Sequence, residues 1–334
     1  MSPPQVLIRV TESSQVGEAR RNAARIAELT SLSETDCGKA AIVATELANN
    51  LIRHAREGEI LISAFRSPSK RGVELLAIDR GPGMADVGKC LQDGFSTGGT
   101  AGQGLGAIRR LSSEFDVYSA APGGTVVLSR ILAQTAGDGN LAQWGAICLP
   151  VAGETLCGDN WSIAEVDGIV SIILADGLGH GPIAAEASNE AVGVFDADPG
   201  RDLSRMVEAA HVMMRSTRGG ALAVARADFR RREMKYVGVG NISGTLQTGE
   251  QSRGLFSHNG TVGLQIHKIQ EFVYPWAEKS VLIMHSDGLK SRWDLMGYPG
   301  LLQRHPSVMA GVLYRDFSRG RDDVTVAVVR EVQS

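Results

Sequence analysis

The sequence predicts an α+β protein built as two domains. The chain has 334 residues, more than one hydrophobic core usually holds, and its 43% apolar and 21% charged residues allow it to bury two cores. Apolar runs of strand length recur along the chain, as at 60–65 and 169–175. Apolar residues at helical spacing, as at 14–29, place helices between these strands.

In the first half, strand and helix signals follow one another up to a polar, glycine-containing segment at 134–140, QTAGDGN. We interpret this segment as an interdomain linker, so the expected domains are 1–133 and 141–334. The elements expected before the linker are strand 6–10, helices 14–29 and 34–55, strands 60–65 and 73–78, and helix 107–115.

Beyond the linker, short apolar strands dominate. A stripe of Met206, Val207, Met213 and Met214 indicates the buried face of a helix. The triplet 230–232, three arginines, is interpreted as a solvated turn between strands. The elements expected here are strands 144–151 and 169–175, a helix from about Ile183, helix 202–215, and strands 221–225, 234–239, 281–284 and 324–329.

Composition excludes several classes of function. The net charge of -3 and pI near 6.2 give no electrostatic footprint for DNA or RNA. Cys37, Cys90, Cys148 and Cys157 form no CxxC pair and are too few for a disulfide scaffold. The start, MSPPQ, lacks the features of a signal peptide, and no apolar run approaches membrane-spanning length. We therefore expect a soluble cytoplasmic protein with no nucleic-acid or membrane partner.

Acidic residues at strand ends indicate a metal site. Asp176 directly follows the apolar run 169–175 and begins the sequence DGLGHGP, whose glycines allow a tight turn with accessible carbonyls. Asp159, Asp287 and Asp322 also lie beside apolar segments or a glycine. Magnesium and manganese take such carboxylate and carbonyl oxygens. The alternative is that these aspartates only open turns, as Asp-Gly pairs often do.

Two features of the first half point to a nucleotide. Glu46 and Asn50 lie four apart in the expected helix 34–55, so they share a face and can serve a proton and a cation. The glycine-rich loop 96–106 precedes a helix and offers N–H groups to a phosphate chain, without a Walker lysine. An exposed polar stripe and a flexible surface loop are the respective alternatives.

The first half resembles the GHKL ATPases. The sequences ELANN (46–50), DRGPGM (79–84), the loop 96–106 and GGT (123–125) match the N, G1, G2 and G3 boxes in family order over about residues 5–132, and the run 93–117 is most similar to RsbT-type serine kinases. The resemblance implies a GHKL (Bergerat) α/β sandwich, with Asp79 on the adenine, Asn50 on magnesium and Glu46 polarising the incoming hydroxyl. It further assigns to ATP Gly81, Gly83, Thr97, Gly98, Gly99, Thr100, Gly102, Gly104, Leu105, Gly106 and Thr125. His54, just past the N box, is not a phospho-accepting histidine.

The second half resembles the SpoIIE branch of the PPM phosphatases, and most of all the RsbX type. The sequences CGDNWS, ADGLGHG, STRGGALAVARADF, YVGVGNISG, HSDGL and GRDDVTVAVV carry this resemblance over about residues 141–331. It implies a PPM-type α-β-β-α sandwich and a centre of two Mn²⁺ or Mg²⁺ ions. The ligands implied are Asp159, Asp176, Asp287, Asp322 and the carbonyl of Gly177. Asp322 is preferred to Asp323 because the family usually has Asp followed by Asn, and Arg218 is a candidate phosphate ligand.

Together the resemblances imply a bifunctional enzyme of bacterial stress or sigma-factor signalling. One half phosphorylates serine or threonine of STAS-type antagonist or stressosome-like proteins with ATP and Mg²⁺, and the other removes the phosphate. In the alternative, the first half binds ATP and a partner without phosphate transfer, as an anti-sigma-like module or a switch on the phosphatase. A homodimer is left open.

Overall fold

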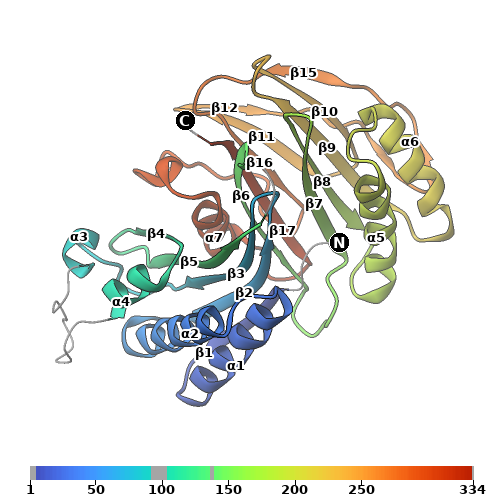
Figure 1. The fold of residues 1–334 in the computed structure, drawn as a ribbon. Helices are drawn as coiled ribbons and strands as arrows, with labels where there is room; N and C mark the ends of the chain where they lie inside the picture. Colours follow the sequence, from blue (N-terminus) through green and yellow to red (C-terminus); the bar gives the residue numbers. More distant parts are fainter. Residues whose placement is uncertain (1–4, 92–103, 136–138, 333–334) are drawn as a thin grey trace. The chain divides into compact units, whose positions relative to one another are not determined.

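The structure is a computed structural model that describes residues 5–91, 104–135 and 139–332. Contacts divide the chain into two compact units (Figure 1). We call Pro3–Gly139 with Tyr298–Arg315 the N-terminal unit, and Asn140–Gly297 with Asp316–Ser334 the C-terminal unit. The expected limits 1–133 and 141–334 stay predictions, but the contacts assign the segment Tyr298–Arg315, which is distant in sequence, to the N-terminal unit.

The N-terminal unit is built on one antiparallel sheet with helices packed on one face (Figure 1). The strand order is β1 (Gln5–Val10), β2 (Gly58–Arg66), β3 (Lys70–Ile78), β5 (Thr125–Gln134) and β4 (Glu114–Ser119). The helices are α1 (Ser14–Leu29), α2 (Glu34–His54), the short α3 (Val87–Cys90) and α4 (Gly104–Leu111).

Small residues let α1 and α2 lie close to the sheet. Ala19 and Ala23 of α1 and Ala44 and Ala48 of α2 are fully buried in one core with the sheet residue Ile62. The side chain of Ser33 accepts a hydrogen bond from the N–H of Asp36 and so caps the start of α2. The expected helices 14–29 and 34–55 therefore form within one residue of their predicted ends.

One expected helix is too long. We predicted a helix over 107–115, but α4 ends at Leu111 and strand β4 begins at Glu114. Ser112 closes the helix by donating its hydroxyl to the carbonyl of Ile108. Phe115 instead pairs with Ser129 across the sheet, because β4 and β5 form a hairpin that single-segment periodicity does not reveal.

The opposite face of this sheet is covered by a segment from the far end of the chain. It comprises η2 (Leu301–Gln303) and α7 (Pro306–Phe317), of which the unit includes residues up to Arg315. A Cβ on Gly311 would lie 2.8 Å from Val126 and 3.2 Å from Leu76, so α7 packs tightly on β5 and β3 at that glycine. The sequence did not indicate this helix.

The C-terminal unit contains two antiparallel sheets of five strands each (Figure 1). The first runs β15 (Phe272–Pro275), β10 (Glu233–Val239), β9 (Gly220–Asp228), β8 (Ile169–Gly177) and β7 (Asp159–Val166). The second runs β12 (Gln251–Gly254), β11 (Ser243–Thr248), β16 (Val281–His285), β17 (Val324–Glu331) and β6 (Ala142–Leu149). Trp144 and Trp161 join them edge to face, with ring centroids 5.5 Å apart.

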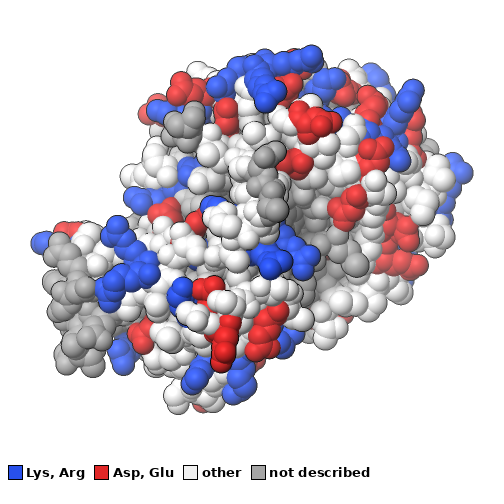
Figure 2. Space-filling view, in the orientation of Figure 1, with Lys and Arg blue, Asp and Glu red and all other residues white. Residues whose placement is uncertain are grey.

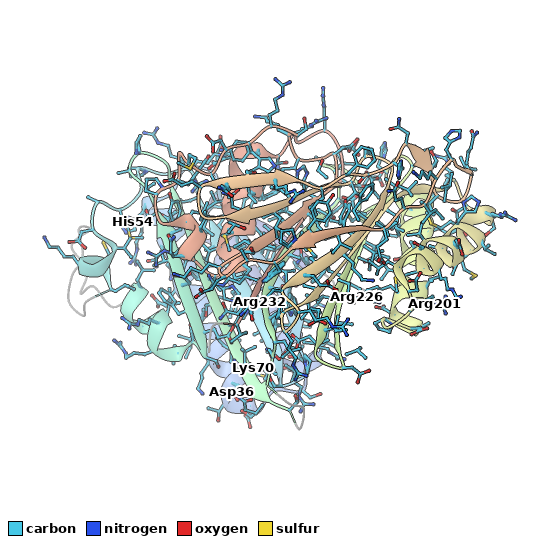
Figure 3. All side chains as sticks on the ribbon, turned by 90° about the horizontal axis from the view of Figure 1, so that it is seen from above. Asp36, His54, Lys70, Arg201, Arg226 and Arg232 are labelled. Atoms are coloured by element: carbon cyan, nitrogen blue, oxygen red, sulfur yellow. The ribbon has the colours of Figure 1, made fainter. Side chains whose placement is uncertain are left out.

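Helices α5 (Pro182–Ala197) and α6 (Leu203–Met213) cover the first of these sheets, and the 3₁₀ turn η1 (Met214–Ser216) follows. Arg226 of β9 fastens the connection between them, because its guanidinium donates to the carbonyls of Pro199 and Arg201, both at 2.7 Å (Figure 3). Met213 was expected in the core but is 49% exposed, whereas its neighbour Met214 is fully buried. The helix ends at Met213, so the buried stripe does not continue through it.

The surface carries charges of both signs. Lys and Arg side chains lie among Asp and Glu side chains on the face shown in Figure 2. The triplet 230–232 lies in the turn between β9 and β10, as expected, and all three arginines are exposed. Within the described ranges, no helix is both long enough and apolar enough to span a membrane.

Candidate functional site

The candidate nucleotide site begins where β3 ends, at Asp79. Its Oδ1 accepts a hydrogen bond from the N–H of Gly81 at 2.6 Å, and its backbone N–H donates to the carbonyl of Thr125 at 2.9 Å. Burial raises the pKa of Asp79, and the Gly81 N–H and the Arg315 charge oppose that rise. A carboxylate held in this way at a strand end can accept a hydrogen bond from a ligand amine.

Two positions beside Asp79 are occupied by glycines because a Cβ would not fit there. A Cβ on Gly81 would lie 2.8 Å from both Asp79 Oδ1 and the carbonyl oxygen of His54 at the end of α2. Gly124 has φ of 78°, and a Cβ there would overlap the Asp79 carbonyl oxygen. Gly81 of the DRGPGM motif and Gly124 of the GGT motif are therefore required by close approach of neighbouring atoms. His54 itself is exposed (Figure 3).

The structure brings Asn50 together with the end of the glycine-rich loop. A Cβ on Gly104, the first residue of α4, would lie 3.0 Å from Asn50 Oδ1. Glu46 lies one turn earlier on the same face of α2 and is half-buried. The start of α4 and the Asn50 side chain thus adjoin, as a phosphate and cation site needs.

The structure describes some of the other residues predicted to bind the nucleotide, and the rest lie outside the described ranges. Gly104, Leu105 and Gly106 form the first turn of α4. Thr125 is buried, with its hydroxyl 2.9 Å from that of Ser119. The expected residues Thr97, Gly98, Gly99, Thr100 and Gly102 lie outside the described residues.

The candidate metal centre is built on a cross-strand pair of acids. Asp159 begins β7, Asp176 lies near the end of β8, and the two residues are directly opposite in the antiparallel register. Directly opposite residues project from the same face of a sheet, with Cβ atoms about 5 Å apart. Two like charges in this position repel each other, so the pair needs a compensating cation or proton.

Burial increases the need of these two acids for a compensating cation or proton. Asp159 is 4% exposed, and its Oδ2 has no hydrogen-bond partner in the described structure. Burial raises the pKa of Asp159 to about 7, with further contributions from the charges of Asp323 and Asp287. Burial likewise raises the pKa of Asp176 to about 9, aided by Asp159, Asp287 and Asp322. This excess of buried acid, with an orphaned oxygen, fits a hard divalent cation.

The second sheet supplies the other expected ligands. Asp287 follows β16 and Asp322 precedes β17, two adjacent antiparallel strands whose ends meet at the same edge. Asn241 donates from Nδ2 to Asp287 Oδ2 at 2.8 Å and so orients that carboxylate. Asn241 was not among the residues predicted from the sequence, although it lies in the YVGVGNISG motif.

Asp323 has a different task from its neighbour. Its Oδ1 accepts from the N–H of Val151 and its Oδ2 accepts from that of Gly158, both at 2.7 Å. These two bonds fasten the ends of the loop that precedes β7. Asp322 Oδ1 accepts from the N–H of Asp323 at 2.9 Å, and the choice of Asp322 as the metal ligand of the pair stays a prediction.

The loop after β8 adds polar groups beside the acids. The N–H of Gly177 donates to the carbonyl of Gly158 at 3.1 Å, which ties this loop to the start of β7. His180 Nδ1 lies 2.8 Å from Glu154 Oε1. Exposed Arg218 reaches the same loop, 3.6 Å from where a Cβ on Gly179 would be. An arginine there can receive a phosphoryl group.

The acids do not form a finished ligand cage. Across 5–91, 104–135 and 139–332, no group of three or more His, Cys, Asp or Glu side chains is arranged to hold a metal ion. The donor chemistry and the orphaned Asp159 oxygen fit a divalent cation, and ligation by the full expected set stays a prediction.

Comparison with known proteins defines both parts. Residues 10–131 match the family model of the histidine kinase-like ATPase domain, and residues 167–331 match that of stage II sporulation protein E (SpoIIE). The chain is 32% identical to serine/threonine-protein kinase RsbT of Bacillus subtilis (strain 168) over 123 residues, which are 37% of this chain and 92% of RsbT. It is 27% identical to phosphoserine phosphatase RsbX of the same strain over 139 residues, 41% of this chain and 69% of RsbX.

Solved structures give the same picture for the fold. One aligned chain has TM-score 0.54 and 25% identity, and the alignment covers 57% of this chain and all of that one. It comes from the structure described as "The bacterial stressosome: a modular system that has been adapted to control secondary messenger signaling". RsbX in complex with magnesium aligns with TM-score 0.51 and 22% identity, covering 58% of this chain and 98% of RsbX.

The chain therefore belongs to the histidine kinase-like ATPase family of RsbT in its first part, and it joins to this part a SpoIIE-type PPM domain. This confirms the recognised families and the expected α+β fold class, a GHKL sandwich followed by a PPM sandwich. The roles of individual site residues stay predictions.

Proposed function

We propose that this chain is a bifunctional signalling enzyme that removes phosphate from, and adds it to, serine or threonine residues of STAS-domain proteins in the cytoplasm. The observation that carries the phosphatase half is the cross-strand pair of buried Asp159 and half-buried Asp176, with the orphaned Asp159 oxygen. The similarity to RsbT over nearly all of that protein's length supports the kinase half.

In the phosphatase half, Asp159, Asp176, Asp287, Asp322 and the Gly177 carbonyl would hold two Mn²⁺ or Mg²⁺ ions. Bound divalent ions supply Lewis acidity and lower the pKa of an attacking water. Asn241 keeps the carboxylate of Asp287 in place through its 2.8 Å hydrogen bond. Arg218, beside Gly179, orients the substrate phosphoryl group and offsets its charge.

In the kinase half, Asp79 receives the adenine amino group, and the glycine-rich loop with the first turn of α4 holds the phosphates of ATP. Asn50 would hold the Mg²⁺ that accompanies ATP. Glu46 aligns the partner's hydroxyl for in-line attack, and it lies one helical turn from Asn50 on the same face of α2. Catalysis in this half is mostly positioning.

Two assays on the full chain test this proposal. Hydrolysis of p-nitrophenyl phosphate in Mn²⁺ is expected for the parent and lost in Asp159→Asn. Transfer from γ-labelled ATP to a STAS-domain protein of the same genome is expected for the parent and lost in Glu46→Ala. A parent without metal-dependent hydrolysis would refute the phosphatase half, and labelled-ATP binding without transfer to any STAS protein would refute the kinase half.

A specific observation favours a second candidate for the N-terminal unit, a nucleotide-dependent switch on the phosphatase. The segment Tyr298–Arg315 connects the regions of Asp287 and Asp322 along the chain, yet it folds as part of the N-terminal unit. At its end, Arg315 lies beside the nucleotide residue Asp79, and its Nη1 is 3.5 Å from the Asp79 carbonyl oxygen. Arg80 also donates to the Arg315 carbonyl.

A buried polar network holds this segment in place. Arg130, 2% exposed, donates to Glu74 at 2.7 Å and to the hydroxyl of Ser307 at 3.0 Å. Asp116 accepts from the backbone N–H of His305 at 2.6 Å, just before α7 begins. Because Arg130, Glu74 and Ser307 are buried and hydrogen-bonded, a change at Asp79 can be transmitted to the segment that connects the two expected metal ligands along the chain.

The two candidates are separated by measuring p-nitrophenyl phosphate hydrolysis with and without ATP. A switch predicts that ATP changes the rate in the parent and in Glu46→Ala, which binds ATP without transferring phosphate, but not in Asp79→Asn. Equal rates with and without saturating ATP in the parent would refute the switch.

A further inference from the structure

A pair of cysteines lies against the candidate metal centre. Cys148 is the penultimate residue of β6, and Cys157 lies in the loop that precedes β7. Their Sγ atoms are 3.6 Å apart, although nine residues separate them in sequence. Cys148 Sγ is also 3.5 Å from the carbonyl oxygen of Asp159. Both cysteines are reduced, and each is half-buried.

The backbone holds the two thiols at this distance. Cys148 is paired with Thr325 of β17, which fixes its strand. Asp323 fastens the intervening loop at both ends through the N–H groups of Val151 and Gly158. The approach of the sulfur atoms is therefore a property of the fold, and closing the last gap needs little loss of chain entropy.

We propose that Cys148 and Cys157 form a reversible disulfide on exposure to a peroxide and that this bond switches off the metal centre. One thiol reduces hydrogen peroxide and becomes a sulfenic acid, with release of one water. The second thiol then attacks that sulfur, forms the S–S bond and releases a second water. Two thiols thus lose two electrons and two protons to one peroxide, and a dithiol reductant reverses the bond.

The bond would move a ligand. A disulfide has its sulfur atoms about 2.05 Å apart, so the sulfurs must approach by about 1.5 Å from their present 3.6 Å separation. Cys157 is two residues from Asp159, and Cys148 touches the Asp159 backbone. The shift therefore reaches the carboxylate that faces Asp176. Metal sites lose function when ligands move by a fraction of an ångström.

Disulfide formation takes seconds to hours depending on the oxidant, so the experiment follows a time course. The activity arm of the test rests on the proposed phosphatase function, whereas bond formation does not.

The other two cysteines can be replaced without changing the proposed pair. Cys37 and Cys90 belong to the N-terminal unit, on α2 and α3, so the double variant Cys37→Ser, Cys90→Ser leaves only the proposed pair. No Lys or Arg lies between Arg130 and Arg201, so trypsin releases both cysteines of the pair in one peptide. In hydrogen peroxide, we expect the thiol count of this variant to fall from two to none and the peptide to lose two hydrogen atoms.

Hydrolysis of p-nitrophenyl phosphate in Mn²⁺ is expected to fall at least tenfold with the same time course and to recover in dithiothreitol. In the matched variants that also carry Cys157→Ser or Cys148→Ser, activity is expected to persist in peroxide, because no intramolecular bond can form. Both variants are checked for native circular dichroism.

The outcomes separate the parts of the proposal. Persistence of both thiols, or pairing between two chains, overturns it, and so does a closed disulfide with full activity. If the reduced variant hydrolyses nothing, the proposed phosphatase function fails, while the thiol count and peptide mass still decide whether the bond forms.

Discussion

Replacing Asp176 by asparagine tests the metal centre through stability as well as activity. In the metal-free protein, Asp176 faces Asp159 across the strand pair, and burial raises its pKa to about 9. The folded-state pKa lies above the unfolded value of 3.8, so the folded state binds more protons between those values. The contribution of Asp176 to the stability of the metal-free C-terminal unit is therefore fully present below pH 3.8 and is lost as the pH rises through about 9.

The expected magnitudes are measurable. Divalent metal at a hundred times its dissociation constant stabilises a fold by about 2.7 kcal/mol. For a unit of about 180 residues, this corresponds to roughly 5–10 °C in Tm. Asp176→Asn keeps the size of the side chain and removes the charge, so it should abolish most of this metal-induced shift. Without metal at pH 9, the variant should be more stable than the parent, by about 1–3 kcal/mol.

Differential scanning calorimetry in EDTA and in Mn²⁺, at pH 6 and pH 9, reads both effects. Phosphatase activity on a phosphoserine partner should be lost in the variant, while phosphate transfer from ATP persists because the ATP motifs belong to the other unit. A variant with the parent's metal-induced Tm shift would refute the metal assignment of Asp176. A variant less stable than the parent at pH 9 in EDTA would refute the argument from repulsion.

Four further substitutions test the N-terminal unit. Glu46→Ala should reduce phosphate transfer from labelled ATP at least a hundredfold, because Glu46 acts on the acceptor hydroxyl. The same variant should keep its ATP affinity within about twofold in calorimetry. Asn50→Ala, one helical turn away, should instead weaken the binding of Mg²⁺-ATP. Gly104→Val should weaken ATP binding at least tenfold in titration calorimetry, because even a Cβ there would lie 3.0 Å from Asn50 Oδ1. Unchanged affinity would favour the alternative that this loop is only a surface loop. Ser307→Ala should lower the free energy of unfolding by about 1–3 kcal/mol in urea, because the Ser307 hydroxyl donates to Glu74 at 2.7 Å and accepts from Arg130. An unchanged urea midpoint would contradict this account of the buried network.

Sequence reasoning worked best where one segment carries its own signal. The run 169–175 predicted β8 because continuous β-branched residues specify a buried strand, and the structure extends it only to Gly177. The same holds for α1, whose predicted limits are those observed. The aspartates were found because each adjoins such a run. The cross-strand pairing of Asp159 with Asp176 depends on register, which no single segment reveals.

Other features depend on partners distant in sequence. The tasks of Asp322 and Asp323 differ because only Asp323 meets the backbone N–H groups of Val151 and Gly158. The approach of Cys148 to Cys157 arises from strand pairing and from that loop, with no motif spacing to announce it. Strand β4 was mistaken for the end of a helix because its identity comes from its hairpin with β5.

Helix α7 shows most clearly what sequence pattern leaves undecided. Nearly every residue of Pro306–Phe317 is buried, so the segment lacks the one-sided stripe that distinguishes a surface helix. Its apolar side chains need cover, and the sheet of the N-terminal unit provides it at Leu76 and Val126. A truncated chain that begins at residue 141 would lose that cover and leave Ser307 without its hydrogen-bond partner Glu74. The two sets of motifs are thus separate in sequence, but a segment from the second half of the chain folds with the N-terminal unit, so each activity has to be tested by substitution in the full chain.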